Sequence, residues 1–252
     1  MKKSVLIIFV LVSFCFLNYL YADHFDDGLI LYYSFDLDPI DDQVPDESMG
    51  NHPGTITGAL QVPTGKNDKD KAYYFDGSED SIIAGDLGYN EIGSISFWMN
   101  PEVVENYRNP FSTDFAGWDD CIRFEEYSTG MFVWGALGFG SGVITNSLQP
   151  NLWYHVVFVW DDINTYAYLN GALVLTTPYP DPDSSVHPNI PGTAGEWRLL
   201  SLTFRNVAIG NGYGQDPNRW WKGLVDEVRI YNRVLDAYDV DKLYRKEKKK
   251  TK

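Results

Sequence analysis

Short runs of aromatic and β-branched residues alternate along the chain with clusters of glycine, proline, asparagine and aspartate. The runs at 29–35, 72–75, 94–99 and 153–160 have the composition of β-strands, and turn residues bound each of them. Helical periodicity is confined to the segment after Asp236. Many short strands separated by turns are typical of antiparallel sandwiches, so the pattern predicts an all-β fold.

Two hairpins and one helix can be placed within this pattern. Asn170-Gly171 separates two alternating runs, and both residues accept the positive φ that a two-residue turn requires. A second hairpin is predicted to join 121–126 to 131–137. At the C-terminus, Asp236 is expected to cap a short helix.

The two ends of the chain differ from its middle. Residues 1–22 begin with two lysines and an apolar run and end at Ala22, which predicts a secretory signal and an extracellular or periplasmic protein. Because Leu20 is large for a cleavage motif, a retained anchor is the alternative. A single domain is predicted over 23–244. The basic tail at 245–252 is either solvated or attracted to an anionic surface.

The overall charge excludes one class of partner. The chain has 20 Lys and Arg against 35 Asp and Glu, a net charge of −15. Nucleic-acid affinity depends on clustered cations, so nucleic-acid binding is not expected. Cleavage after Ala22 would remove Cys15 and leave Cys121 without a partner, so we expect no disulfide to stabilise the domain.

Asp226 is the most informative acidic residue. Strict alternation in the last strand-like run places it on one face with Leu224, Val228 and Ile230. A carboxylate in an apolar row is costly unless it finds backbone donors, an arginine or a metal ion. All three alternatives are open from the residues alone.

An acidic loop near the other end of the chain also offers oxygen ligands. Asp46 and Asn51 carry the carboxylate and amide oxygens that Ca²⁺ prefers, although the spacing is not that of an EF-hand. An ordinary acidic turn is the alternative. No histidine pair has zinc-binding spacing, and His155 is interpreted as a structural hydrogen-bonding residue.

Exposed aromatic rings beside carboxylates suit carbohydrate recognition. Trp118 lies next to Asp119 and Asp120 in a loop-like segment, and Trp220 precedes Trp221, so that on a strand only one of the two would be buried. Trp118, Asp119, Asp120 and Trp220 are therefore candidate ligand-binding residues, with packing as the alternative role.

Taken together, the segments resemble a known family. They are Gly28–Asp36, Asp46–Ala59, Ala72–Gly77, Ser96–Trp98, Trp153–Val156, Tyr168–Gly171, Ile209-Gly210 and Gly223–Leu235. In this order they resemble the LamG-like jelly-roll domains of the concanavalin A-like lectin/glucanase superfamily.

The resemblance implies a two-sheet antiparallel jelly-roll sandwich with a short C-terminal helix. It also implies an extracellular module that binds glycans or proteins and holds a structural Ca²⁺. Asp46, Asn51 and Asp226 match the family's calcium positions, and Asp36 is a further candidate ligand. The Glu-x-Asp-x-x-Glu pattern of related laminarinases is absent from the sequence, so no catalytic residue is assigned.

The sequence thus predicts a secreted, non-catalytic binding module for a glycan, with calcium bracing the first acidic loop against the last strand. An extracellular protein–protein or adhesion module is one alternative. A glycoside hydrolase or lyase of the same fold is the other. No stable membrane span is expected once the signal is removed.

Overall fold

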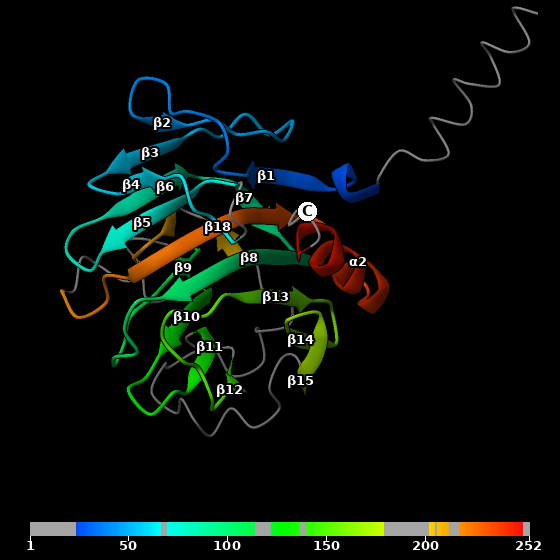
Figure 1. Ribbon diagram of the computed structural model, residues 1–252. Coiled ribbons are helices and arrows are strands. Elements are labelled where there is room, and N and C mark those ends of the chain that lie inside the picture. Colours follow the sequence, from blue (N-terminus) through cyan, green and yellow to red (C-terminus); the bar gives the residue numbers. More distant parts are fainter. Residues whose placement is uncertain are drawn as a thin grey trace, which may run out of the picture.

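The computed structural model describes residues 24–66, 70–113, 122–136, 140–178, 202–204, 206–211 and 217–248. Two antiparallel sheets of eight strands each pack face to face, and a C-terminal helix lies against the outside of the first sheet (Figure 1). The jelly-roll sandwich predicted from the sequence is confirmed.

The first sheet has the order β15-β14-β13-β8-β18-β5-β4, and β1 also pairs with β18. Its strands are β1 (Leu29–Tyr33), β4 (Leu60–Val62), β5 (Ala72–Asp76), β8 (Gly93–Pro101), β13 (Tyr154–Trp160), β14 (Asn164–Leu169), β15 (Ala172–Pro178) and β18 (Lys222–Tyr231). The first and last strands of the domain are therefore hydrogen-bonded neighbours, which brings its two ends together.

The second sheet has the order β12-β11-β10-β9-β17-β6-β3-β2. Its strands are β2 (Gln43–Val44), β3 (Gly54–Thr57), β6 (Ser81–Gly85), β9 (Phe111–Ser112), β10 (Ile122–Glu126), β11 (Phe132–Ala136), β12 (Gly140–Thr145) and β17 (Val207–Ile209). The remaining elements are the short pair β7 (Gly88–Asn90) and β16 (Leu202–Phe204), the 3-10 turn η1 (His24–Asp26) and the helix α2 (Ala237–Lys248).

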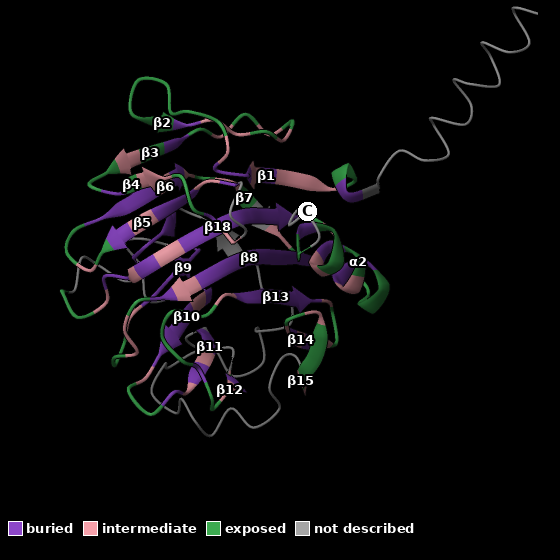
Figure 2. Cartoon of the chain, in the orientation of Figure 1, coloured by how far each residue is buried: buried purple, intermediate pink, exposed green. Residues whose placement is uncertain are grey.

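Aromatic side chains from both sheets fill the space between them. Figure 2 shows buried residues in the strands of both sheets. The ring of Phe97 stacks on Phe111 at 5.6 Å and meets Phe124 edge-on at 5.1 Å. Phe124 in turn contacts Phe158 at 5.9 Å. Each fully buried ring of this kind contributes about 1.5–3 kcal/mol, so this cluster holds the two sheets together.

Both predicted hairpins are present. Asn170 and Gly171 have φ values of 52° and 81° between β14 and β15, as a two-residue turn demands. Gly130, with φ of 81°, lies in the turn between β10 and β11. His155 in β13 hydrogen-bonds Ser96 at 2.9 Å, which confirms its structural role.

The prediction for β18 is wrong in one respect. A β-bulge at Asp226–Arg229, with Glu227 at φ 51°, interrupts the alternation. Val225, Val228 and Ile230 therefore face the core. Asp226 points to the opposite side of the sheet and not into an apolar row, because the extra residue of the bulge resets which side chains share a face.

The predicted helix is confirmed, with a later end. The carboxylate of Asp236 accepts the amide hydrogen of Asp239 at 2.8 Å and caps α2. Val240 and Leu243 pack against the outer face of the first sheet. The helix continues to Lys248 with Glu247 buried, so the domain extends beyond the predicted boundary at 244.

Several predictions fall on residues outside the described ranges. They are the signal at 1–22, Cys15 and Cys121. Among the described residues, no helix has the length and apolar character needed to cross a membrane.

Candidate functional site

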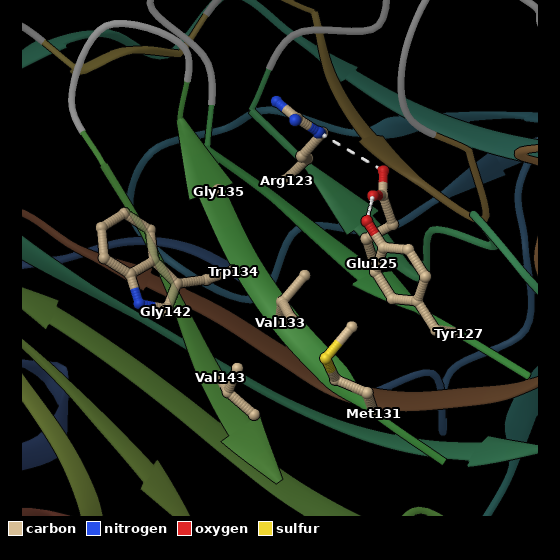
Figure 3. Close-up of a pocket in the computed structure, with 9 residues that line it drawn as sticks. All are labelled: Arg123, Glu125, Tyr127, Met131, Val133, Trp134, Gly135, Gly142 and Val143. Atoms are coloured by element: carbon tan, nitrogen blue, oxygen red, sulfur yellow. Dashed lines mark hydrogen bonds and ion pairs between the residues drawn. The ribbon is translucent and has the colours of Figure 1, made fainter. Parts of the chain in front are cut away.

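The face of the second sheet that points away from the core carries a pocket of about 520 Å³ over β10, β11 and β12 (Figure 3). Phe124 of β10 points into the core. Its neighbours Arg123 and Glu125, and Tyr127 just beyond the strand, point to the other side. These three side chains, called the polar row below, form one wall of the pocket.

An apolar strip lies beside the polar row. Met131, Val133 of β11 and Val143 of β12 line this side of the pocket. Val133 stands directly opposite Glu125 on one neighbouring strand and opposite Val143 on the other. Val143 is 41% exposed. The pocket therefore offers hydrogen-bonding groups along one strand and aliphatic surface along the next.

Glu125 is the centre of the polar row. Its Oε1 accepts the hydroxyl hydrogen of Tyr127 at 2.6 Å, and its Oε2 accepts a hydrogen bond from Arg219. The Nε of Arg123 lies 3.4 Å from the same Oε2. Burial and this hydrogen bond to Glu125 raise the pKa of Tyr127 to about 12, so its hydroxyl stays protonated. The carboxylate is held rigidly by groups from separate segments.

An aromatic corner adjoins the polar row. Tyr107, 44% exposed, meets Tyr127 edge-on with ring centroids 5.4 Å apart. The guanidinium of Arg219 lies 5.5 Å from the centre of the Tyr107 ring. Tyr107 has a φ of 71°, which is uncommon for a bulky residue and typical of functional sites.

This arrangement matches the chemistry of a sugar. A sugar ring has an apolar C–H face and an edge of hydroxyl groups that both donate and accept hydrogen bonds. The apolar strip and the tyrosine rings suit the face, and the carboxylate and guanidinium groups suit the hydroxyls. Pockets that hold small ligands have volumes of about 300–1,000 Å³, a range that includes this one.

Of the four ligand-binding residues predicted from the sequence, Trp220 is described, and it does not line this pocket. Trp118, Asp119 and Asp120 lie outside the described residues. Trp220 is only 5% exposed and Trp221 is fully buried. The expectation that one of the pair is exposed is wrong, because both precede the start of β18 and do not alternate across a strand.

The predicted calcium ligand Asp46 is already fully hydrogen-bonded. Its Oδ1 accepts the amide hydrogens of Tyr32 and Ser48 at 2.9 Å, and its Oδ2 accepts those of the His52 amide and the Ser48 hydroxyl. Four donors occupy the acceptor positions of a carboxylate. The neighbouring Asn51 is exposed, with φ of 58°. Asp46 therefore organises its own turn.

Asp226 is fully buried beside a lysine rather than an arginine. The ammonium group of Lys66 lies 3.5 Å from Asp226 Oδ2, 2.7 Å from Glu227 Oε1 and 3.3 Å from Asp70 Oδ2, and its side chain is 1% exposed. Burial is the largest cause of a pKa of about 8 for Asp226; Lys66 lowers this pKa and Glu227 raises it. Within the described part of the chain, Asp226 Oδ1 has no hydrogen-bond partner.

These residues do not fit the predicted calcium ion. Asp36 accepts the amide hydrogen of Lys71 at 2.9 Å, and Asp46 is satisfied by donors in its own loop and by Tyr32 of β1. Burial raises the pKa of Asp226 to about 8, which disfavours the ionised form that a metal ligand needs. No group of three or more His, Cys, Asp or Glu side chains in the described ranges has the arrangement of a metal site.

Part of the pocket could have been found from the sequence. Arg123, Glu125 and Tyr127 are spaced two apart in a predicted hairpin strand, and this spacing puts them on one face. Tyr107 and Arg219 contact the polar row from distant segments, at Tyr127 and Glu125, and no local pattern marks either residue.

The comparisons with known proteins agree with this architecture. Residues 76–241 match the Laminin_G_3 family, described as the concanavalin A-like lectin/glucanases superfamily. The chain belongs to this family. A search of curated proteins finds no match.

Solved structures share the fold of this family member at low sequence identity. Domain 4 of AbnA, an extracellular GH43 arabinanase from Geobacillus stearothermophilus solved with arabinotriose, has a TM-score of 0.63 and 22% identity, over 86% of this chain and 98% of that one. The binding domain of Paraclostridial Mosquitocidal Protein 1 has a TM-score of 0.65 and 16% identity, over 88% and 53%.

A third structure is the ligand-binding domain of botulinum neurotoxin serotype D in complex with N-acetylneuraminic acid. It has a TM-score of 0.59 and 14% identity, over 88% of this chain and 52% of that one. At these identities the three likenesses show the fold alone.

Proposed function

We propose that the protein is a secreted, non-catalytic carbohydrate-binding module whose site is the pocket over β10, β11 and β12. The observation that carries the proposal is the polar row centred on Glu125, which lies directly beside the apolar strip in an open pocket. A sugar ring contacts a polar surface and an apolar surface at the same time. A protein–protein interface needs a larger apolar patch than this pocket offers.

Two known ligands of proteins with this fold support the proposal. The arabinanase domain was solved with arabinotriose and the neurotoxin domain with N-acetylneuraminic acid. The signal predicted at 1–22 supports export, which would bring the module into contact with extracellular glycans.

The composition of the pocket supports a non-catalytic role. Hydrolysis of a glycosidic bond requires two carboxyl groups on opposite sides of the bond. Glu125 is the single carboxylate among the described residues that line the pocket. Its two oxygens are held by Tyr127 and Arg219, so it is placed to accept hydrogen bonds and not to transfer protons.

A glycan array probed with the full chain tests the proposal and identifies the preferred sugar. Titration of that sugar against Val133→Asp then locates the site, because a carboxylate in the apolar strip disrupts contact with the sugar face. We expect roughly a tenfold or greater loss of affinity.

Leu173→Asp is the matched control, since Leu173 is an exposed apolar residue on β15 of the other sheet. Its affinity should remain within about twofold of the wild type. Binding of no glycan on the array, or equal losses in the two variants, would refute the proposed site.

A further inference from the structure

The outer face of α2 presents a basic surface on an acidic protein. Lys242, Arg245, Lys246 and Lys248 are all exposed, and the Arg245 side chain is 66% exposed. The full chain, by contrast, carries a net charge of −15. These four side chains are called the basic face below.

The acids of the helix are turned away from this face. Asp239 is 4% exposed and pairs with Arg233 at 2.7 Å. Glu247 is 1% exposed and accepts hydrogen bonds from Arg229 and the indole of Trp98. On this helix two acids are therefore buried and paired with arginines, whereas the cations are exposed.

Asp241 is the acid that remains near the basic face. It pairs with Arg245 at 2.8 Å, four residues further along the helix. Among the residues of α2 itself, four exposed cations thus accompany one partly exposed acid.

Aromatic rings underlie three of the ammonium groups. The Nζ of Lys242 lies 4.8 Å from the ring centre of Tyr238, that of Lys246 lies 5.2 Å from Phe25, and that of Lys248 lies 5.2 Å from Tyr244. Tyr238 is 61% exposed. Lysine stems with charged tips beside amphipathic rings are the combination found where proteins meet the polar layer of a membrane.

The first described element, η1, lies at the same place. Phe25 in η1 packs with Val240 and Leu243 of α2, and Figure 1 shows η1 and α2 at the same end of the first sheet. The sequence that leads into η1 contains the apolar run of residues 5–12.

We propose that the basic face docks on an anionic membrane surface by binding lipid headgroup phosphates. The overall negative charge does not prevent this, because charges more than about 8 Å apart in physiological salt are largely screened. Each lysine near an anionic bilayer contributes about fivefold to affinity. Docking needs only the folded helix, so it does not require the N-terminal segment to remain attached.

Vesicle flotation tests this proposal. The full chain, as the expressing cells process it, is mixed with vesicles of phosphatidylcholine alone or of phosphatidylcholine with phosphatidylglycerol. We expect stronger binding to the anionic vesicles, and a loss of this preference as salt is raised. Lys242→Gln/Lys246→Gln should lower the affinity for anionic vesicles roughly 25-fold.

Lys71→Gln/Lys222→Gln is the matched control, because it removes the same charge from two partly exposed lysines on other elements. This variant should bind within about threefold of the wild type. Thermal unfolding of both variants checks that the fold is intact. Equal binding to the two kinds of vesicle, or equal losses in the two double variants, would overturn the proposal.

Discussion

The outer faces of the two sheets carry the same three chemical groups in different surroundings. On the first sheet, Glu227 accepts hydrogen bonds from Tyr32 at 2.8 Å and Arg229 at 2.6 Å; we call this the covered trio. On the second sheet, Glu125 accepts hydrogen bonds from Tyr127 and Arg219, the open trio.

The two trios differ in what lies over them. Lys66 covers the first, and the glutamate side chain there is 0% exposed. The glutamate and arginine side chains of the second are 6% and 12% exposed, against 0% and 9% in the first, and the second trio lies beside a pocket of about 520 Å³. The same groups therefore form a structural cluster where Lys66 covers them, whereas on the second sheet they border the pocket of the proposed binding site.

The first prediction, with the largest expected effect, is that the two trios differ in how much they contribute to the stability of the fold. Arg229→Met should lower the free energy of unfolding by about 3–5 kcal/mol, because it removes the guanidinium that pairs with both buried carboxylates, Glu227 and Glu247. Arg219→Met, the matched change in the open trio, should cost less, because Arg123 and Tyr127 still contact Glu125. Urea unfolding measures both values, and equal losses would show that the two trios have the same role.

The second prediction concerns pH. Burial raises the pKa of Asp226 to about 8, so its contribution to stability is complete below its unfolded pKa of about 4 and is lost as pH rises through 8. Burial lowers the pKa of His155 to about 3, so its contribution is present above about pH 6.5 and is lost as pH falls toward 3.

The two slopes oppose each other between about pH 4 and 6.5, but other buried acids with raised pKa values act over the same range, so stability should fall gently there. Between pH 6.5 and 8 it should fall. Glu126, whose pKa burial also raises to about 8, adds to this fall. Asp226→Asn should therefore give a shallower decline in the free energy of unfolding from pH 6.5 to 8.5. An unchanged decline in this variant would show that Asp226 is ionised in the folded protein.

The third prediction tests the open trio through its aromatic corner. Tyr107→Ala removes a ring that is 44% exposed and contacts both Tyr127 and Arg219. We expect roughly a tenfold loss of sugar affinity in calorimetric titration. Because the Tyr107 ring is partly exposed to solvent, the melting temperature of the variant should fall by only a few degrees. A variant that keeps full affinity would remove Tyr107 from the site.

The smallest expected effect is that of chelation. A ligand at 100 times its dissociation constant would stabilise the protein by about 2.7 kcal/mol. Since Lys66 supplies a fixed positive charge beside Asp226, we expect EDTA to leave the melting temperature unchanged. A melting temperature that falls by several degrees with EDTA and recovers when calcium is added would support the calcium ion predicted from the sequence. It would contradict the conclusion that Asp36, Asp46 and Asp226 do not fit this ion.

Much of the fold follows from local sequence patterns. The strand runs, the Asn170-Gly171 turn and the Asp236 cap depend on residues close together in the chain, and all three are confirmed. The bulge at Glu227 is different. Glutamate gives no local sign that it will adopt positive φ, so the alternation rule placed Asp226 on the wrong face.

The candidate site was less predictable than the fold. Arg219 reaches Glu125 across 94 positions of sequence, and Lys66 reaches Asp226 across 160. Such pairings are decided by how the sheets stack. The sequence identified Asp226 as a residue that needs a positive partner, but it could not distinguish a calcium ion from a lysine borne by another loop.

The most direct test of the open trio as a carbohydrate site is a titration with Glu125→Gln. This change keeps the shape of the side chain and removes the charge that accepts hydrogen bonds from sugar hydroxyls. We predict that affinity for the best sugar from the array falls at least tenfold, as expected for a charged hydrogen bond of about 1.5–3 kcal/mol, while the fold stays intact. An affinity equal to that of the wild type would contradict the account.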